Sequence, residues 1–147
     1  LYLSTAAYTK CSWFKVSNTG YSNNIISGGG FAQHAFWLGA TTKLSAGHNG
    51  NWYTVQSTTN ISTGVWYFGA VTFDTTNGWK MYLNGVQEST NANTTTFSTN
   101  TQTIQIGAYD AGNFLIGNIA NAVVYNRVLS ASEIKQNYNA TKGRFGL

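Results

Sequence analysis

The sequence has little charge, a single cysteine and no long apolar run. Only 8% of its 147 residues are charged, where soluble domains ordinarily have about a quarter. With 42% hydrophobic and 15% aromatic residues, the chain is still apolar enough to fold around a core. No apolar stretch approaches the roughly 20 residues that cross a membrane as a helix, so we expect no membrane partner.

The basic residues are few and scattered. The net charge is +4, but Lys142 and Arg144 lie in the last seven residues, and no Lys/Arg cluster occurs elsewhere. A nucleic-acid partner is therefore not expected. Cys11 has no partner for an internal disulfide, and its place inside a predicted strand indicates a buried, unreactive thiol.

Neutral polar residues are abundant, because Ser, Thr and Asn make up 49 of the 147 residues. Thr favours strands, whereas Asn and Ser favour turns, so this composition indicates a β-rich fold. Short apolar or alternating runs recur between Gly, Asn and Ser clusters, a pattern typical of a sandwich or barrel. The predicted strands cover residues 8–16, 24–27, 35–39, 43–46, 52–56, 65–73, 79–84, 103–107, 114–116 and 119–125.

Local patterns predict a central strand, a hairpin turn, a helix and a long connection. Both faces of 65–73 are apolar, which predicts a central strand covered on both sides. Asn84-Gly85 predicts a type I′ hairpin turn after 79–84. Ser130 and Glu133 form a capping box that begins one short C-terminal helix. The polar stretch 89–103 predicts a long connection with one further strand near Phe97.

Taken in order, many residues resemble the laminin-G-like, concanavalin-A-like family. They are Thr9, Trp13-Phe14-Lys15, Trp66, Phe73-Asp74, Tyr82-Leu83-Asn84-Gly85, Ile106-Gly107, Phe114, Gly117, Ile119, Tyr125-Asn126-Arg127, Leu129-Ser130 and Glu133-Ile134. The resemblance implies an all-β fold, a two-sheet antiparallel jelly-roll sandwich, over residues 1–140, with 141–147 as a C-terminal tail. The family includes lectins, adhesion modules, glycosidases and scaffolds, so the fold alone does not fix the function.

The C-terminal residues 137–145 resemble the ends of laminin-G-like virion proteins from tailed bacteriophages. That similarity implies a virion surface or other extracellular location, other virion proteins as partners, and an oligomeric assembly. The sequence departs from the family after Ile119, where many relatives have acidic residues and this chain has Ala120 and Asn121. A calcium role that depends on those acids is therefore not carried over.

Acidic residues are too few for the usual hydrolytic sites. Glycosidases need a pair of carboxylates, and this chain has only Asp74, Glu88, Asp110 and Glu133, without the Glu-x-Asp-x-Glu strand of the family's glycosidases. Neither His34 nor His48 lies near a nucleophile motif, so both are expected to be exposed loop residues, with His34 alternatively lining a groove. One Cys and two His fall short of a zinc site.

The resemblance also implies a possible calcium site, because this fold often binds calcium at its rim, where the loop 109–113 is expected to lie. Asp110 supplies one carboxylate and Asn113 one amide, whereas calcium takes 6–8 oxygen ligands. A plain turn is the expected structure there, with a weak calcium site near Asp110 as the alternative and no other cofactor.

Glycan binding requires aromatic platforms beside hydrogen-bonding groups. Trp13 and Trp66 lie within apolar strand sequence, which predicts core positions. Aromatic residues beside polar turns are better candidates, although core packing is the alternative for each. The candidate carbohydrate-binding residues are Trp37, His48, Asn51, Trp52, Tyr53, Tyr109, Asp110 and Asn113.

We therefore expect a non-catalytic, surface-displayed module of a virion structural protein (a decoration, fibre or appendage) that binds glycans or host-surface glycoconjugates. A purely structural assembly subunit without a ligand is the main alternative, and a glycoside hydrolase is a remote one. The shortage of carboxylates is the residue-level basis for expecting no enzyme.

Overall fold

The computed structural model describes residues 3–29, 34–97, 103–110 and 112–147. In chain order the elements are β1 (Ala7–Val16), β2 (Asn23–Asn24), β3 (Ile26–Ser27), β4 (Ala35–Leu38), β5 (Lys43–Gly47), β6 (Val55–Asn60), β7 (Tyr67–Asp74), β8 (Gly78–Leu83), β9 (Val86–Asn91), β10 (Gln105–Ile106), β11 (Gly117–Tyr125), the helix α1 (Ala131–Thr141) and the 3-10 helix η1 (Lys142–Phe145). The described residues thus form an antiparallel all-β fold with one C-terminal helix, as the sequence predicts.

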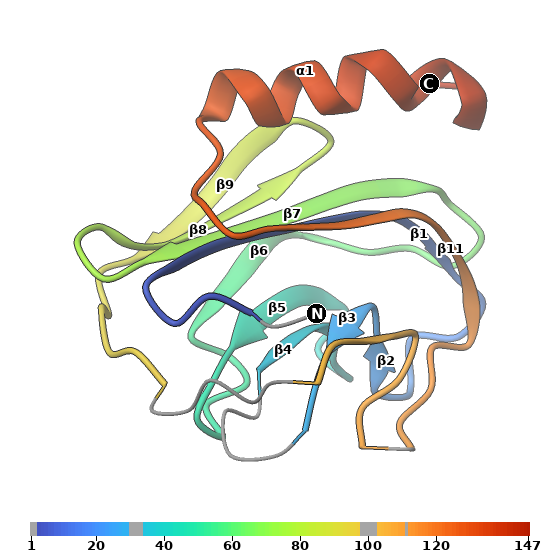
Figure 1. The fold of residues 1–147 in the computed structure, drawn as a ribbon. Coiled ribbons are helices and arrows are strands. Elements are labelled where there is room, and N and C mark those ends of the chain that lie inside the picture. The colour runs from blue at the N-terminus through green and yellow to red at the C-terminus, as the bar shows by residue number, and fades with distance from the viewer. Residues whose placement is uncertain (1–2, 30–33, 98–102, 111) are drawn as a thin grey trace.

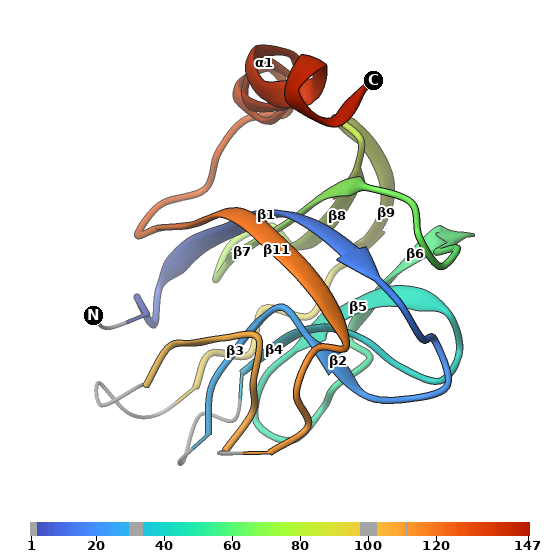
Figure 2. The same cartoon turned by 90° about the vertical axis from the view of Figure 1, so that its right-hand side faces the viewer.

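The strands form two facing layers, and a helix covers one of them. The large sheet has the order β11-β1-β7-β8-β9, the small sheet has the order β2-β4-β5-β6, and β10 pairs with β3 alone. All pairings are antiparallel. In Figures 1 and 2 the small sheet lies below the large sheet, and α1 lies above it. None of the described helices is long and apolar enough to cross a membrane.

Both faces of the central strand β7 are apolar, because each packs in a different apolar cluster. Val71 and Phe73 point into the core between the two sheets, whereas Phe68 and Ala70 belong to a second apolar cluster on the helix side. Gly69 permits a close approach of the layers, because an added Cβ would lie 2.8 Å from Leu44 of the small sheet. The prediction of a strand covered on both sides is confirmed.

The hairpin after β8 follows the predicted turn chemistry. Asn84 and Gly85 both have positive φ angles, 49° and 78°, as a type I′ turn requires. The Asn84 side chain also accepts a hydrogen bond from the Phe68 backbone N–H at 2.9 Å. The turn and this hydrogen bond therefore fix the register of β7 against β8 at this end of the large sheet.

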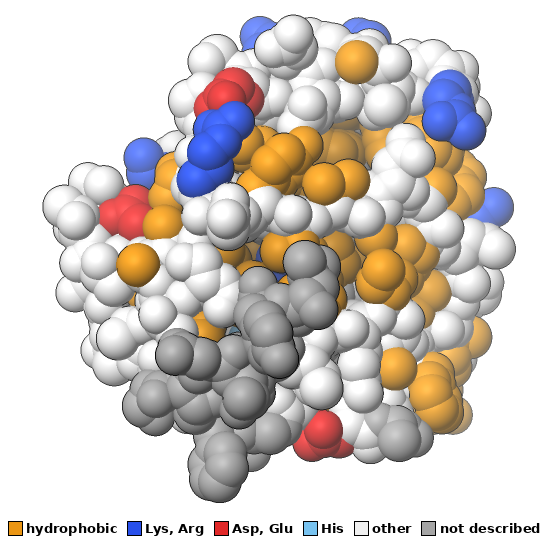
Figure 3. Space-filling model, in the orientation of Figure 1, with side chains coloured by type: hydrophobic (Ala, Val, Ile, Leu, Met, Phe, Trp, Pro, Cys, Tyr) orange, Lys and Arg blue, Asp and Glu red, His pale blue; other side chains and the backbone are white. Residues whose placement is uncertain are grey.

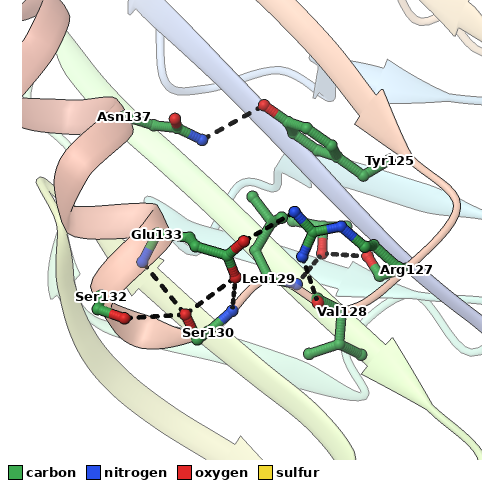
Figure 4. A network of polar contacts seen from close by, with 9 residues as sticks. Tyr125, Arg127, Val128, Leu129, Ser130, Ser132, Glu133 and Asn137 are labelled. Atoms are coloured by element: carbon green, nitrogen blue, oxygen red, sulfur yellow. Dashed lines mark hydrogen bonds and ion pairs between the residues drawn. The ribbon is translucent and has the colours of Figure 1, made fainter.

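The helix α1 begins at the predicted capping box, which Figure 4 shows. The Ser130 Oγ accepts from the Glu133 backbone N–H at 3.3 Å, and the Ser130 N–H donates to Glu133 Oε2 at 2.7 Å. Arg127 donates to the other carboxylate oxygen at 2.7 Å, and this hydrogen bond together with those from Ser130 lowers the pKa of Glu133 to about 2. Asn137 reaches from the helix to the Tyr125 hydroxyl of β11. These contacts and the buried Ile134 dock α1 on the large sheet.

Residues 141–147, expected to form a tail, continue the helical segment across the sheet. Thr141 ends α1, and its hydroxyl accepts from the Trp13 indole N–H at 2.8 Å. In η1, the Phe145 ring stacks on Trp13 with their centroids 4.1 Å apart and also contacts Trp66 at 4.7 Å. Trp13 is fully buried, as its strand sequence indicates.

Several predicted strands differ from the structure. Residues 24–27 are divided between β2 and β3, which pair with different strands. Trp52 and Tyr53 lie in a turn before β6 instead of within a strand, and residues 114–116 form no strand. Phe97 is a core residue outside any strand. In each case long-range packing overrides a short apolar pattern.

Candidate functional site

Aromatic and amide side chains from separate parts of the chain surround a cavity of about 150 Å³ on the outer side of the small sheet. We call it the aromatic cavity. Its lining residues are Ser22, Asn24, Ala35, Trp37, Trp52, Tyr109 and Asn113. Four of these residues are candidates from the sequence. Ser22, Asn24 and Ala35 are not among those candidates. The sequence pattern around them does not indicate that their side chains lie on the same face.

Trp37 reaches the cavity because of strand alternation. Its neighbours Phe36 and Leu38 are fully buried in the core, so the Trp37 side chain points to the opposite face of β4. Its indole N–H donates to the Trp52 backbone oxygen at 3.0 Å, and its ring packs 5.2 Å from the Tyr53 ring. Tyr53 is thus a support for Trp37 and does not line the cavity itself.

Trp52 and Tyr109 form the aromatic edge of the cavity. Their ring centroids lie 5.2 Å apart at an interplanar angle of 77°. Tyr109 is fixed by two backbone hydrogen bonds exchanged with Gly112, each 2.9 Å long. Asn24 on β2 donates its amide to the Asn113 backbone oxygen at 2.8 Å, which ties the 109–113 loop to the small sheet. Ala111 of this loop lies outside the described residues.

The aromatic cavity has no charged side chain among its lining residues. The Asp110 carboxylate lies against Gly29, where an added Cβ would come within 1.4 Å of Asp110 Oδ1. Partial burial and the neighbouring Asp110 raise the pKa of Tyr109, so its hydroxyl stays protonated and can donate a hydrogen bond. Figure 3 shows the charged side chains sparsely distributed on the face it displays. The cavity therefore offers aromatic faces, amides and hydroxyls, which suit a neutral polar ligand.

Two of the predicted candidates lie in a second hollow. His48 and Asn51 line a cavity of about 170 Å³ that we call the Trp79 cavity. Its other lining residues are Asn49, Thr54, Trp79, Asn93 and Thr95. The loop between β5 and β6 therefore contributes Trp52 to one cavity and His48 with Asn51 to the other, so the eight candidates do not form a single site.

The expectation that both histidines are exposed is wrong. His48 is 4% exposed and His34 is fully buried. His48 donates from Nε2 to the Thr95 backbone oxygen at 2.6 Å, and burial lowers its pKa to about 4. His34 Nε2 donates to the Thr103 oxygen at 3.0 Å, and burial together with the nearby Lys10 lowers its pKa to about 2. Because His34 is buried, it does not line a groove.

Three of the four carboxylates accept hydrogen bonds from neighbouring parts of the fold. Asp74 accepts from the backbone N–H groups of Thr76 and Asn77, as in a turn. Glu88 accepts from the backbone N–H groups of Thr58 and Thr59 at 2.9 and 3.0 Å. Glu133 caps α1. Within residues 3–29, 34–97, 103–110 and 112–147, no three His, Cys, Asp or Glu side chains gather around a possible metal position.

Comparisons with solved structures agree on the fold. A suggested carbohydrate-binding protein from Bacteroides ovatus is 19% identical with a TM-score of 0.73, covering 92% of this chain and 41% of that protein. Domain 4 of an extracellular arabinanase from Geobacillus stearothermophilus, in complex with arabinotriose, is 22% identical with a TM-score of 0.73, covering 91% and 67%. Trypanosoma rangeli sialidase is 17% identical with a TM-score of 0.67, covering 94% and 23%.

The chain thus spans less than half of the Bacteroides protein and about a quarter of the sialidase. A comparison with curated protein sequences found no match. At the level of sequence families, residues 1–135 match one family over nearly the whole chain. The protein therefore belongs to the laminin-G-like family described as the concanavalin A-like lectin/glucanases superfamily.

Proposed function

We propose that this domain is a non-catalytic glycan-binding module and that the aromatic cavity holds an uncharged sugar ring. The single observation that carries the proposal is the convergence of Trp37, Trp52 and Tyr109 with the amides of Asn24 and Asn113 around one hollow. Rings of this kind present apolar faces to the C–H groups of a sugar, while amides and the Tyr109 hydroxyl serve its hydroxyl groups.

The rigidity of these groups supports binding. Trp37 is held by its hydrogen bond to Trp52 and by Tyr53, and the 109–113 loop is tied to β2 through Asn24. A site whose side chains are already fixed loses little conformational entropy when it takes a ligand. The arabinotriose complex of the arabinanase domain, which has the same fold, is consistent with a sugar-binding role.

We place the module on the surface of a virion, as part of a decoration, fibre or appendage protein that contacts host glycoconjugates. The resemblance of residues 137–145 to tailed-phage virion proteins is the support for this location. In that setting the partners are host-surface glycans and other virion proteins in an oligomeric assembly.

The test is a glycan array followed by isothermal titration calorimetry with the glycans that bind. We expect saturable binding that Trp52→Ala weakens at least about tenfold, because one aromatic platform is lost. Trp66→Ala is the matched control, since Trp66 packs against Phe145 on the helix side of the large sheet. Equal affinity for the wild type and Trp52→Ala would exclude the aromatic cavity as the binding site.

A purely structural role is the second candidate. Ile106, Phe114, Ile116 and Val123, from β10, β11 and the segment between them, are between 37% and 61% exposed. Figure 3 shows exposed apolar side chains on the side of the molecule where β11 lies. Exposed apolar groups of this kind suit contacts with neighbouring subunits. A particle map that buries both these residues and the aromatic cavity against neighbouring subunits would favour this role over glycan binding.

A further inference from the structure

Only three aromatic residues are exposed in the part of the chain that the structure describes, and all three border the aromatic cavity. They are Tyr21, Tyr53 and Phe114, which are 59%, 46% and 61% exposed. Each is next in the chain to a lining residue of the cavity, namely Ser22, Trp52 or Asn113. Neighbouring Cα atoms lie about 3.8 Å apart across a trans peptide bond, so each exposed side chain begins at the edge of the cavity. Single exposed apolar residues are ordinary on a protein surface, whereas a group of them marks a binding surface.

Tyr53 is held against the small sheet without being buried. Its ring centroid lies 5.2 Å from that of Trp37, at an interplanar angle of 51°. Gly39 leaves room for this contact, because an added Cβ there would come within 3.2 Å of the Tyr53 hydroxyl oxygen. Tyr53 is fixed in place by these contacts, and its exposed part remains available to a ligand.

On this side the aromatic residues continue beyond the cavity. Tyr109 packs against Trp52, whose backbone oxygen accepts from the Trp37 indole N–H. Trp37 packs in turn against Tyr53. The first three of these residues line the cavity, whereas Tyr53 lies outside it. A ligand that extends from the cavity past Trp37 therefore meets a further aromatic ring.

Tyr21 and Phe114 border a different wall of the cavity, the one formed by Ser22 and Asn113 beside β2. Hydrogen bonds from Asn23 hold the backbone of this wall. The Asn23 Oδ1 accepts from the Ile116 backbone N–H at 2.8 Å, and its Nδ2 donates to the Tyr21 backbone oxygen at 3.0 Å. The segments that carry the two exposed rings are thus joined to each other. Exposed aromatic groups therefore border the cavity at two separate walls.

The aromatic cavity itself has room for little more than one sugar ring. Its volume of about 150 Å³ is below the roughly 300–1,000 Å³ of pockets that enclose drug-sized ligands. A single ring inside the cavity leaves the exposed aromatic groups outside it without a contact. All of them are contacted only when the ligand continues on both sides of the ring that the cavity holds.

Building on the proposed glycan-binding function, we propose that the ligand is the interior of an uncharged saccharide chain of three or more rings. The central ring occupies the aromatic cavity, one neighbouring ring contacts Tyr53, and the other contacts Tyr21 and Phe114. Aromatic side chains present apolar surface to the C–H groups of each flanking ring, which adds to the affinity. The site therefore distinguishes saccharide chains from single sugars.

The test is the dependence of affinity on chain length. The ¹⁵N-labelled protein is titrated with neutral arabino-, xylo-, cello- and manno-oligosaccharides of one, two and three rings. Shifts of the Trp37 and Trp52 indole N–H resonances give the Kd of each saccharide. For at least one series, we expect the Kd to fall at least about tenfold from one ring to three, because two flanking rings gain aromatic contacts.

Variants assign this gain to the exposed aromatic residues. Tyr53→Leu keeps an apolar side chain beside Trp37 but removes the aromatic face. It should reduce the ratio of the single-ring Kd to the three-ring Kd at least about threefold. The double variant Tyr21→Ala/Phe114→Ala should reduce that ratio by a similar factor. Val86→Ala is the matched control and should leave the ratio unchanged, because Val86 is 63% exposed but lies on β9 of the large sheet.

Three other outcomes overturn the inference. Equal Kd values for one and three rings in the wild type, with binding weakened in Trp52→Ala, mean that the cavity takes a single ring; the proposed function then stands and the inference fails. A ratio that Tyr53→Leu and the double variant both leave unchanged means that the added rings contact another surface. If no saccharide of any length binds, the proposed function fails together with the inference.

Discussion

The Lys10 amino group lies 2.7 Å from His34 Nδ1, and both side chains are fully buried. The amine also donates to the Ile26 backbone oxygen at 3.1 Å and lies 5.5 Å from the centre of the Tyr8 ring. A neutral amine has two N–H groups, which these two acceptors satisfy. Lys10 thereby links β1 of the large sheet to β3 and to the segment before β4.

The first prediction concerns stability in mild alkali. Burial lowers the pKa of Lys10 well below its usual value, so the amine is protonated in the unfolded chain but disfavours a proton in the fold. Unfolding therefore takes up a proton, and this contribution to stability rises with pH until the unfolded lysine titrates near 10.4. We expect the free energy of unfolding to increase from about pH 7 to pH 8.5, by at most about 1.4 kcal/mol per pH unit.

The measurement is urea unfolding of the wild type and Lys10→Met across that window. The upper limit avoids the opposite effect of Cys11, because burial raises its pKa to about 12 and the unfolded thiol ionises near 8.5. Lys10→Met should flatten the pH dependence. An unchanged slope in the variant would show that Lys10 stays protonated in the fold.

The second prediction concerns acid. Burial lowers the pKa of His48 to about 4 and, with Lys10, lowers that of His34 to about 2. Both histidines are neutral in the fold but gain a proton near pH 6.5 when unfolded. Their contribution is therefore complete above pH 6.5 and declines as pH falls toward 4, with a loss on the order of 3 kcal/mol for His48.

Unfolding is compared at pH 7 and near pH 5 in the wild type and in His48→Gln, because carboxylates contribute mainly at lower pH and the contribution of the buried Lys10 is common to both proteins. Although burial raises the pKa of Glu88, hydrogen bonds from Thr58 and Thr59 hold it below its usual value. His48→Gln should reduce the difference between the two pH values. Equal stability at both pH values in the wild type would contradict the buried, neutral state of the histidines.

The third prediction concerns the C-terminal segment. Phe145 stacks on the buried Trp13, so Phe145→Ala should lower the free energy of unfolding by about 1–3 kcal/mol through lost aromatic contact. Leu147→Ala is the control, because Leu147 is 49% exposed. Thermal unfolding of both variants provides the comparison. If Phe145→Ala is as stable as the control, the segment after α1 does not contribute to the fold.

Local sequence patterns could predict the elements that depend on near neighbours. The Asn84-Gly85 turn, the capping box at Ser130 and the two-sided strand β7 each follow from residues adjacent in the chain. Burial of the two histidines could not be predicted in this way. Their carbonyl partners, Thr95 and Thr103, are 47 and 69 residues away from them.

The candidate site could be predicted only in part, because sequence patterns indicate near neighbours but not long-range contacts. Aromatic residues beside polar turns were recognisable, and Trp37, Trp52, Tyr109 and Asn113 lie together. His48 and Asn51 line the other cavity, although they belong to the same loop as Trp52. The spacing of these residues in the sequence does not specify the direction in which each side chain points. Only the three-dimensional structure shows that the indole N–H of the buried Trp79 has no hydrogen-bond partner among the residues that the structure describes.

The most direct test of the glycan-binding account is a crystal structure of the domain soaked with a neutral oligosaccharide that binds it on the array. Glycan binding in the aromatic cavity predicts density for a sugar ring in contact with Trp37, Trp52 and Tyr109. Density for the same saccharide elsewhere on the domain, with the aromatic cavity left empty, would contradict it.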